Sequence, residues 1–223
     1  MRVVVANVRG FHQARPAVVA AALGEFAPDV VLMTECGTRR RLRRFASALG
    51  MEPHHGSLPP FLPRVRNAVL VRPPLSVADG GLVVFDGHAP LRRQGAYFAR
   101  VTGADAPFWA VTVHLGLRGE ERGRHADDLM RLLGHSEPPL LVGGDLNAKP
   151  DSRVVAKLTD IGWDAWVRMG QSTGETFPSH EPVARIDYLF VSREVRVDGA
   201  MVPGGAGVRA ASDHLPLVVD LTL

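Results

Sequence analysis

The sequence predicts an α/β fold in which mixed β-sheets pack on each other and helices lie outside them. Short apolar runs rich in valine and leucine alternate with alanine-rich or charged stretches that have helical periodicity. The order strand, helix, strand and then further strands occurs twice, and each time an apolar strand delivers a carboxylate, Glu35 and then Asp145. No low-complexity linker divides the 223 residues, so we expect a single domain over residues 1–223.

The N-terminal part of the chain predicts two buried strands and two helices. Arg2–Val5 and Val30–Met33 are apolar, β-branched runs typical of buried strands. Between them, an alanine-rich helix is expected over Pro16–Phe26, with one buried face formed by Val18, Val19, Ala22, Leu23 and Phe26. Arg39–Leu49 predicts a basic helix that ends at Gly50, the residue type favoured after a helix C-terminus.

The rest of the chain predicts mainly strands, separated by Pro, Gly and Asp turns. Pro53–Pro63 is expected to form a loop, Gly119–Leu133 an amphipathic helix and Ser152–Asp160 a short helix. The expected strands are Ala68–Val71, Leu82–Phe85, Tyr97–Val101, Phe108–Val113, Leu140–Val142, Ile186–Val191 and Leu215–Leu221.

Polar residues stand at the ends of these strands. Four apolar strands are followed by a residue able to bind a metal or a phosphate: Asn7, Glu35, His114, and Asp145 with Asn147. Two later strands are instead preceded by such residues, Asp187 in one case and Asp213 with His214 in the other. If the later two strands run antiparallel to the first four, all these groups meet at one edge of the sheets, where α/β proteins bind ligands.

Each of these residues also has an ordinary structural interpretation when it is taken alone. Gly143–Asn147 could be a simple turn, although its glycines would also let the backbone approach a ligand closely. Glu35 could cap the following helix, and His114 could be a packed, hydrogen-bonded histidine. Ser212–His214 cannot be a hydrolase triad, because adjacent residues do not reach one another in that geometry. The repeated placement at strand ends favours a functional site.

Composition excludes several classes of protein. With 46% hydrophobic and 22% charged residues, the chain is expected to fold around a packed core, and disorder is disfavoured. The formal net charge of +3 permits a polyanionic partner without requiring one, and nearly all the basic residues are arginine, which suits phosphate binding. Cys36 is the single cysteine, and no apolar run is long enough for a membrane helix. We therefore expect a cytoplasmic monomer without a membrane span.

The ordered motifs resemble the endonuclease/exonuclease/phosphatase superfamily, which includes pancreatic deoxyribonuclease, abasic-site endonucleases, sphingomyelinases and inositol-polyphosphate phosphatases. The resemblance extends from residue 7 to residue 216, nearly the whole chain. It includes Asn67-Ala68 and residues 92–95, which are similar to bacterial members. The motifs that carry it are Ala6-Asn7-Val8, Thr34-Glu35, Thr112-Val113-His114-Leu115, Gly144-Asp145-Leu146-Asn147, Ile186-Asp187-Tyr188 and Ser212-Asp213-His214.

The resemblance implies a DNase I-like four-layer α/β sandwich, with two mixed β-sheets flanked by helices and one catalytic domain over residues 1–223. It also implies a Mg²⁺ or Mn²⁺ cofactor, for which Asn7, Glu35 and Asp213 are the candidate ligands. The candidate catalytic residues are His114, Asp145, Asn147, Asp187 and His214. Asp145 is expected to orient or deprotonate the attacking water, although His214 stays open as an alternative base.

The substrate predicted from this resemblance is DNA, cut by an endonuclease or exonuclease with little sequence preference. Arginine-rich segments at Arg39–Arg44, Arg64–Arg66 and Arg92–Arg93 suit phosphate contacts that do not read bases. Arg9 stands where several DNA-repair members have an acidic or amide residue, and the candidate substrate-binding residues are Arg9, Asn67 and Arg93. The alternative is a phosphatase or phosphodiesterase acting on a small-molecule or phospholipid phosphate ester. A non-catalytic binding module is disfavoured, because no site residue is missing.

Overall fold

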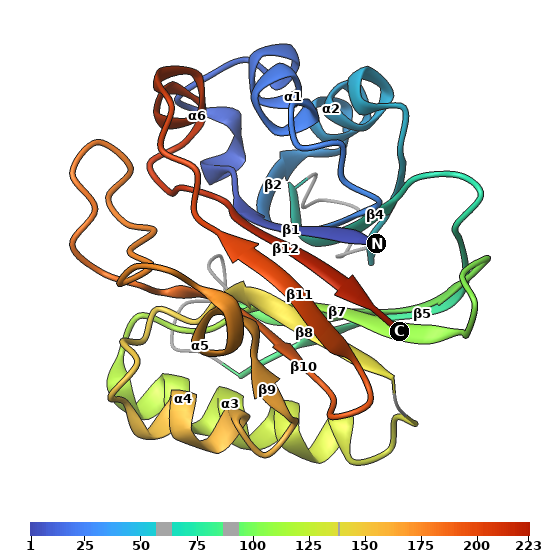
Figure 1. Cartoon of the computed structure of the whole chain (residues 1–223), viewed down its shortest axis with the longest axis vertical. Helices are drawn as coiled ribbons and strands as arrows, with labels where there is room; N and C mark the ends of the chain where they lie inside the picture. The colour runs from blue at the N-terminus through green and yellow to red at the C-terminus, as the bar shows by residue number, and fades with distance from the viewer. Residues whose placement is uncertain (57–63, 87–93, 138) are drawn as a thin grey trace.

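Two mixed six-stranded sheets face each other in the computed structural model of the chain (Figure 1), which describes residues 1–56, 64–86, 94–137 and 139–223. The first sheet has the order β11 (Arg196–Met201), β12 (Leu217–Thr222), β1 (Arg2–Asn7), β2 (Val30–Thr38), β4 (Arg64–Val71) and β3 (Glu52–His54). The second has the order β5 (Ser76–Val84), β6 (Gly95–Thr102), β7 (Phe108–His114), β8 (Leu140–Asp145), β10 (Asp187–Val191) and β9 (Trp163–Asp164).

Helices cover the outer faces of both sheets, which confirms the predicted four-layer α/β sandwich (Figure 1). Over the first sheet lie α1 (Pro16–Gly24), α2 (Arg39–Leu49) and α6 (Ala206–Ala211), and over the second lie α3 (Gly119–Leu133) and α4 (Arg153–Leu158). Two short helical segments complete the fold, the 3-10 helix η1 (Arg9–Phe11) after β1 and the helix α5 (Ala165–Met169) after β9.

Strand directions bring the predicted site residues to one edge. β1 pairs parallel with β2, and β7 pairs parallel with β8. β12 pairs antiparallel with β1, and β10 pairs antiparallel with β8. The expectation that the last two strands run against the first four is therefore confirmed. Residues in the C-terminal parts of β1, β2, β7 and β8 therefore meet the first residue of β10 and the residues that precede β12.

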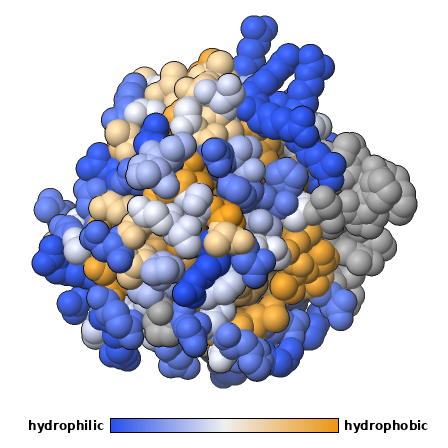
Figure 2. Space-filling view, turned by 90° about the vertical axis from the view of Figure 1, so that its right-hand side faces the viewer, coloured by the Kyte–Doolittle hydropathy of each residue, from blue (hydrophilic) through white to orange (hydrophobic). Residues whose placement is uncertain are grey.

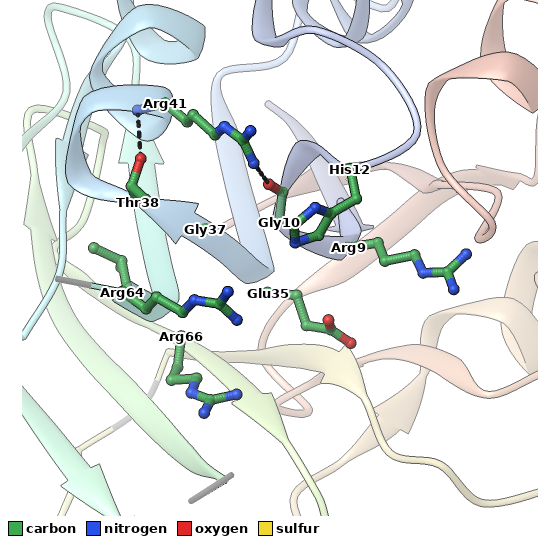
Figure 3. A pocket seen from close by; sticks show the side chains of 10 residues that line it. Arg9, Gly10, His12, Glu35, Gly37, Thr38, Arg41, Arg64 and Arg66 are labelled. Atoms are coloured by element: carbon green, nitrogen blue, oxygen red, sulfur yellow. Dashed lines mark hydrogen bonds between the residues drawn. The ribbon is translucent and has the colours of Figure 1, made fainter. Parts of the chain in front are cut away.

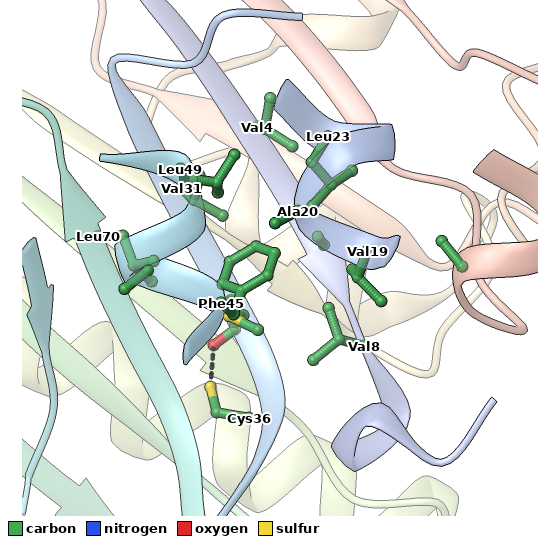
Figure 4. Close-up of a cluster of buried hydrophobic side chains, with 14 of the residues drawn as sticks. Val4, Val8, Val19, Ala20, Leu23, Val31, Cys36, Phe45, Leu49 and Leu70 are labelled. Atoms are coloured by element: carbon green, nitrogen blue, oxygen red, sulfur yellow. Dashed lines mark hydrogen bonds between the residues drawn. The ribbon is translucent and has the colours of Figure 1, made fainter. Parts of the chain in front are cut away.

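Apolar side chains fill three layers, because successive residues of a strand point to opposite faces. Val3 and Val5 lie between the two sheets, whereas Val4 packs against the helices. Figure 4 shows that helix layer, in which Phe45 of α2 lies against the strand residues and Cys36 Sγ contacts the carbonyl oxygen of Met33 at 3.4 Å. Burial raises the pKa of the Cys36 thiol well above its usual value, so the residue behaves as a packed apolar group.

Gly143 and Gly144 are required by close packing within the fold. A Cβ at Gly143 would lie 2.8 Å from the carbonyl oxygen of Tyr188, and one at Gly144, whose φ is +146°, would lie 1.9 Å from that of Val113. The glycines therefore let β8 approach its neighbouring strands. This close approach of strands, and not only the approach of a ligand, explains why glycine is needed at both positions. Their effect on the site is indirect, since they fix the end of β8 at Asp145.

Several expected elements differ in detail. Val18 was expected on the buried face of the first helix, but it is 49% exposed, and Ala20 is buried instead. An alanine-rich helix has little amphipathicity, so its sequence does not determine which face is buried. The helix ends at Gly24 instead of Phe26. Part of the expected Pro53–Pro63 loop forms β3, and residues 57–63 lie outside the described part of the chain. β9, β11, α5 and α6 were not predicted, because short elements at sheet edges and ends carry weak periodicity.

Hydrophilic and apolar side chains are both found on the surface. Figure 2 shows one face of the molecule, on which hydrophilic side chains surround smaller apolar areas. Among the described residues, the large apolar side chains that are exposed come from separate parts of the sequence, such as Leu117, Val167 and Met201. None of the described helices combines the length and the apolar character needed to cross a membrane.

Candidate active site

Asp145 lies at the centre of the site, at the C-terminal end of β8, and is 2% exposed. Its Oδ2 atom accepts a hydrogen bond from Asn7 Nδ2 at 2.9 Å. The same oxygen lies 3.4 Å from His114 Nε2 and 3.9 Å from His214 Nε2. Side chains from three other segments of the chain therefore converge on one carboxylate oxygen.

Asn147 fixes the turn that follows β8. Its backbone has a φ of +50°, and its N–H donates to Asp145 Oδ1 at 2.9 Å. Its side-chain Nδ2 donates to the carbonyl oxygen of Leu115 at 3.0 Å and lies 3.2 Å from His114 Nε2. Because both the backbone and the side chain are held, Asn147 presents a fixed amide beside the two catalytic candidates, His114 and Asp145.

His214 is held by a buried carboxylate. Its Nδ1 lies 2.8 Å from Asp187 Oδ2, and Thr176 Oγ1 donates to that same oxygen at 2.6 Å. The ring of Phe177 packs on the imidazole with the ring centroids 4.8 Å apart. With Nδ1 bound to Asp187, the imidazole is fixed with Nε2 directed at Asp145. Thr176 and Phe177 were missed in the sequence, because they lie in an irregular segment whose pairing depends on the tertiary fold.

Burial and charge act in opposite directions on the two central groups. Burial raises the pKa of the Asp145 carboxyl above its usual value, and the nearby His114 and His214 offset only part of that rise. For His214, burial alone would lower the pKa. The charge of Asp187 and its hydrogen bond outweigh burial, aided by Asp145 and Asp213, and raise the pKa to about 9. His214 therefore carries a positive charge at neutral pH.

Glu35 lies at an irregularity of β2, where the pairing with β4 shifts between Thr34 and Gly37. Its φ is +50°, and its Oε1 accepts from Asn7 Nδ2 at 3.2 Å. A bulge of this kind redirects a side chain, and here it turns the carboxylate toward the site. The interpretation of Glu35 as a helix cap is wrong, because Thr38 caps α2 by accepting from the N–H of Arg41 at 3.3 Å.

Two groups of side chains have the spacing of a metal site among the described residues. Glu35, His114 and Asp145 each offer one ligand atom within 4.8 Å of the others, and so do Asp145, Asp187 and His214. The first group combines two carboxylates that line one cleft, which is the hard oxygen chemistry that Mg²⁺ and Mn²⁺ prefer. The residues present therefore fit a divalent cation beside Glu35.

The structure does not bring the three predicted ligands, Asn7, Glu35 and Asp213, together as oxygen donors. Asn7 directs its amide nitrogen at Glu35 and Asp145, and its Oδ1 accepts from the N–H of Arg9 at 3.0 Å. Asp213 Oδ2 lies 3.1 Å from Arg9 Nη1, and Asp213 belongs to neither metal-type group of the described residues. Of the three, Glu35 alone is in such a group.

The predicted substrate-binding residues are placed differently from one another. The Arg9 side chain is 55% exposed at the edge of the site, where it pairs with Asp213. Asn67 is buried, and its Nδ2 donates to the carbonyl oxygens of Gly95 at 2.7 Å and Thr112 at 3.1 Å. It therefore links β4 of the first sheet to β6 and β7 of the second, away from the open surface. Arg93 lies outside the described residues.

A cleft of about 620 Å³ opens over these groups. Catalytic candidates line its floor, and Arg64 and Arg66 of β4 line one wall beside Glu35. A volume in this range is typical of pockets that hold small molecules or one or two units of a polymer. The arrangement can therefore hold a phosphate ester between buried hydrogen-bonding groups and exposed arginines.

The family model described as the endonuclease/exonuclease/phosphatase family matches residues 4–214 of the chain. No curated protein matches the chain. The family match covers every predicted site residue, from Asn7 to His214.

Solved structures of low sequence identity share the fold. An endonuclease/exonuclease/phosphatase from Bacteroides vulgatus has a TM-score of 0.86 and 19% identity, covering 100% of this chain and 98% of that one. The mannosyl-6-phosphatase of Bacteroides thetaiotaomicron has a TM-score of 0.83 and 17% identity over 100% of both chains. A humanized TDP2 from D. rerio has a TM-score of 0.78 and 17% identity, covering 100% of this chain and 99% of that one. At these identities the likeness shows a common fold.

Proposed function

This chain belongs to the endonuclease/exonuclease/phosphatase family of phosphoric ester hydrolases, and on that premise we propose that it is a Mg²⁺- or Mn²⁺-dependent phosphodiesterase that cuts DNA with little sequence preference. One observation carries the proposal: Asn7, His114 and His214 converge on the buried Asp145 carboxylate, with Glu35 held beside them through Asn7. A hydrogen-bond network that only stabilised the fold would not need to line a cleft, whereas this network does.

Hydrolysis of a phosphodiester requires an oriented water, neutralised phosphoryl oxygens and a stabilised leaving oxygen. Asp145 is the group that orients and deprotonates the water, because its Oδ2 is the atom on which the other side chains converge. Asn147 positions that water with its fixed amide. His114 and His214 donate hydrogen bonds to the developing phosphoryl charge, and Asp187 keeps His214 in the orientation that this needs.

A divalent cation at this site would neutralise charge on the phosphoryl oxygens. Glu35 is the residue that would hold it, with Asp145 or His114 as a partner from the same group. Asn7 has a positioning role here, since its amide nitrogen bonds both carboxylates and sets the distance between them. Asp213 remains a proposed ligand only if its pairing with Arg9 opens when substrate binds.

DNA as the substrate is supported by the arginines of the first sheet. Arg64 and Arg66 line the cleft, and α2 carries further exposed arginines, including Arg40 and Arg43. Arginine contacts of this kind bind phosphates without reading bases. A small phosphate ester is the second candidate. It is favoured by the limited volume of the cleft and by the fold shared with a mannosyl-6-phosphatase over 100% of both chains.

The proposal is tested with purified protein on supercoiled plasmid and on bis(p-nitrophenyl) phosphate, each assayed in EDTA and after addition of Mg²⁺ or Mn²⁺. We expect both reactions to stop in EDTA and to return with the added cation. Plasmid nicking should also fall as salt rises, because phosphate contacts are screened. Full activity in EDTA would exclude a metal-dependent mechanism. Brisk hydrolysis of the small ester without nicking at low salt would favour the second candidate.

A further inference from the structure

A second, smaller pocket adjoins the cleft and shares Glu35, Arg64 and Arg66 with it (Figure 3). Its volume of about 70 Å³ is enough for one tetrahedral oxyanion. Arg64 and Arg66 extend from β4 toward the space in front of Glu35, and Arg41 reaches toward Gly10. We name it the arginine pocket, and its charged residues are Arg9, Glu35, Arg41, Arg64 and Arg66.

The arginine pocket contains more positive than negative charge. Among the residues that the structure describes, four guanidinium groups line it, whereas Glu35 is the single carboxylate of the lining. Arg9 is balanced by Asp213, but Arg64 makes no side-chain hydrogen bond or ion pair with any residue that the structure describes. A bound anion would balance this excess of positive charge. Guanidinium groups bind phosphate through paired, charge-assisted hydrogen bonds, which makes phosphate the matching chemistry.

The walls of the arginine pocket are held in place by backbone contacts. Arg41 Nη1 donates to the carbonyl oxygen of Gly10 at 2.8 Å. Gly37, whose φ is +72°, lies so close to Gly10 that a Cβ on Gly37 would be 2.9 Å from the Gly10 carbonyl oxygen. Arg9 and Glu35 also have positive φ values, 44° and 50°. Strained backbone of this kind persists where the surrounding structure fixes it, and it clusters at ligand sites.

We propose that the arginine pocket binds a second phosphate group of the same substrate molecule whose first phosphate reacts at Asp145. The two spaces are neighbours, since Glu35, Arg64 and Arg66 line both. The second phosphate is the neighbouring backbone phosphate of a DNA strand or the other phosphate of a small bisphosphate, and both present the same chemistry to the arginines. This inference rests on the proposed function and adds to it a preference for substrates with two phosphates.

The experiment compares substrates that differ only in the second phosphate. One pair is a thymidine trinucleotide and an analogue in which one of its two linkages is an uncharged methylphosphonate. The other pair is a hexose bisphosphate and the corresponding hexose monophosphate. We expect wild type to prefer the charged member of at least one pair by about tenfold or more in kcat/KM, the size of a charge-assisted contact. The pair that shows the preference identifies the source of the second phosphate.

Arg64→Ala should abolish that preference by raising KM for the charged substrate, and Arg64→Lys should restore part of it. The matched control is Arg153→Ala, which removes an exposed arginine of α4 that is not part of the arginine pocket, and it should keep the preference. Equal kcat/KM for both members of both pairs in wild type would overturn the proposal, as would an unchanged preference in Arg64→Ala.

A binding measurement separates this proposal from the proposed function. In EDTA, the affinity of wild type for a fluorescent trinucleotide should fall with salt, and Arg64→Ala should lower the slope of log K against log salt by about 0.7, the share of one lost contact on a single strand. If no phosphate ester is hydrolysed but Arg64→Ala changes the slope, the proposed function is wrong, and the proposal that the arginine pocket binds phosphate is supported. If hydrolysis proceeds and Arg64→Ala binds like wild type with the same slope, the arginine pocket fails alone.

Discussion

The two sheets supply different kinds of group to the same site. The second sheet contributes His114, Asp145 and Asp187, which are 4%, 2% and 1% exposed and lie in a network of close polar contacts. The first sheet contributes the buried Asn7 and, just before β12, the buried His214. It also contributes Glu35, from a strand irregularity with positive φ, and arginines that are half-buried or exposed. Both sheets use the same local arrangement, a parallel strand pair with a helix between the strands.

This difference separates two tasks. Buried, hydrogen-bonded groups keep fixed positions and strong local fields, which suits proton transfer and charge stabilisation. Exposed cations and a carboxylate on a bulge suit the capture of a metal and of phosphates, which arrive from water. The comparison predicts that changes to the buried network, to which the second sheet contributes His114, Asp145 and Asp187, lower kcat. Changes to Glu35 and the arginines of the first sheet should instead alter the metal or substrate concentration that the enzyme needs.

The largest effect is expected for Asp145→Asn. Loss of a general base typically lowers the rate by roughly 10²–10⁴-fold. The variant should therefore lose nearly all kcat on bis(p-nitrophenyl) phosphate while its circular dichroism spectrum stays that of wild type. Asp151→Asn is the matched control, because Asp151 is an exposed carboxylate close in sequence, and it should keep full activity. A folded Asp145→Asn enzyme with most of its kcat would remove Asp145 from the chemistry.

Glu35→Gln comes next and acts on the other sheet. The amide keeps the shape of Glu35 but weakens the cation site, so the Mg²⁺ concentration for half-maximal activity should rise by roughly 10–100-fold. At saturating Mg²⁺, kcat should recover in large part, unlike that of Asp145→Asn. Asp213→Asn provides the comparison, and an equal shift in its Mg²⁺ requirement would establish Asp213 as a second ligand. An unchanged Mg²⁺ requirement in Glu35→Gln would contradict the division of tasks.

The sequence predicts some parts of the two sheets and of the site but not others. The position of Asp145 after an apolar strand could be predicted, because the apolar run leads through Gly143 and Gly144 to that carboxylate. The strand itself continues to Asp145, whereas it was expected to end at Val142. α2 was predicted with its observed bounds, since Gly50 marks its end with a φ of +64°. The direction in which Asn7 points its amide could not be predicted, nor could the contact of Thr176 with Asp187. Both depend on residues distant in the chain that only the tertiary fold brings together.

The arginines illustrate the same limit. Residues 64–66 were recognised as a basic segment, but the sequence does not show that Arg64 and Arg66 turn toward Glu35 while Arg41 bonds the loop at Gly10. Asn67 was expected at the substrate and is instead buried between the sheets. The residues around Asn67 in the sequence do not show that its side-chain amide contacts strands of the second sheet.

Thr176→Val tests the support behind His214 and should have a moderate effect. It removes the hydrogen bond to Asp187 Oδ2, which measures 2.6 Å, and keeps the volume of the side chain. A hydrogen bond to a charged group contributes about 1.5–3 kcal/mol, so kcat should fall by roughly 10–100-fold. Thr176→Ser retains the hydroxyl and should restore most of the rate. If both variants lose the same activity, the hydroxyl is not the relevant group and Thr176 acts through packing.

The smallest effect is expected at the end of the first sheet that lies opposite the site. There, Arg2 of β1 pairs with Asp220 of β12 at 2.7 Å, at the other end of the strand from Asn7. The pair is partly exposed, so Asp220→Asn should lower the free energy of unfolding by about 1 kcal/mol or less. Because no substrate or cation group is touched, kcat and the Mg²⁺ requirement should equal those of wild type.

The stability effect of Asp220→Asn should depend on pH in a defined direction. The hydrogen bond from Arg2 lowers the pKa of the Asp220 carboxyl, although partial burial opposes that shift. A carboxyl whose pKa is lowered by folding stabilises the protein above its unfolded pKa of about 3.9, and that stabilisation is lost as pH falls through the lower folded value. Urea unfolding from pH 7 to the lowest pH at which both proteins fold should therefore show a gap between wild type and variant that narrows below about pH 4. A gap that widens on acidification, or a changed kcat, would mean that this end of the sheet is coupled to the site, and the separation of tasks would have to include it.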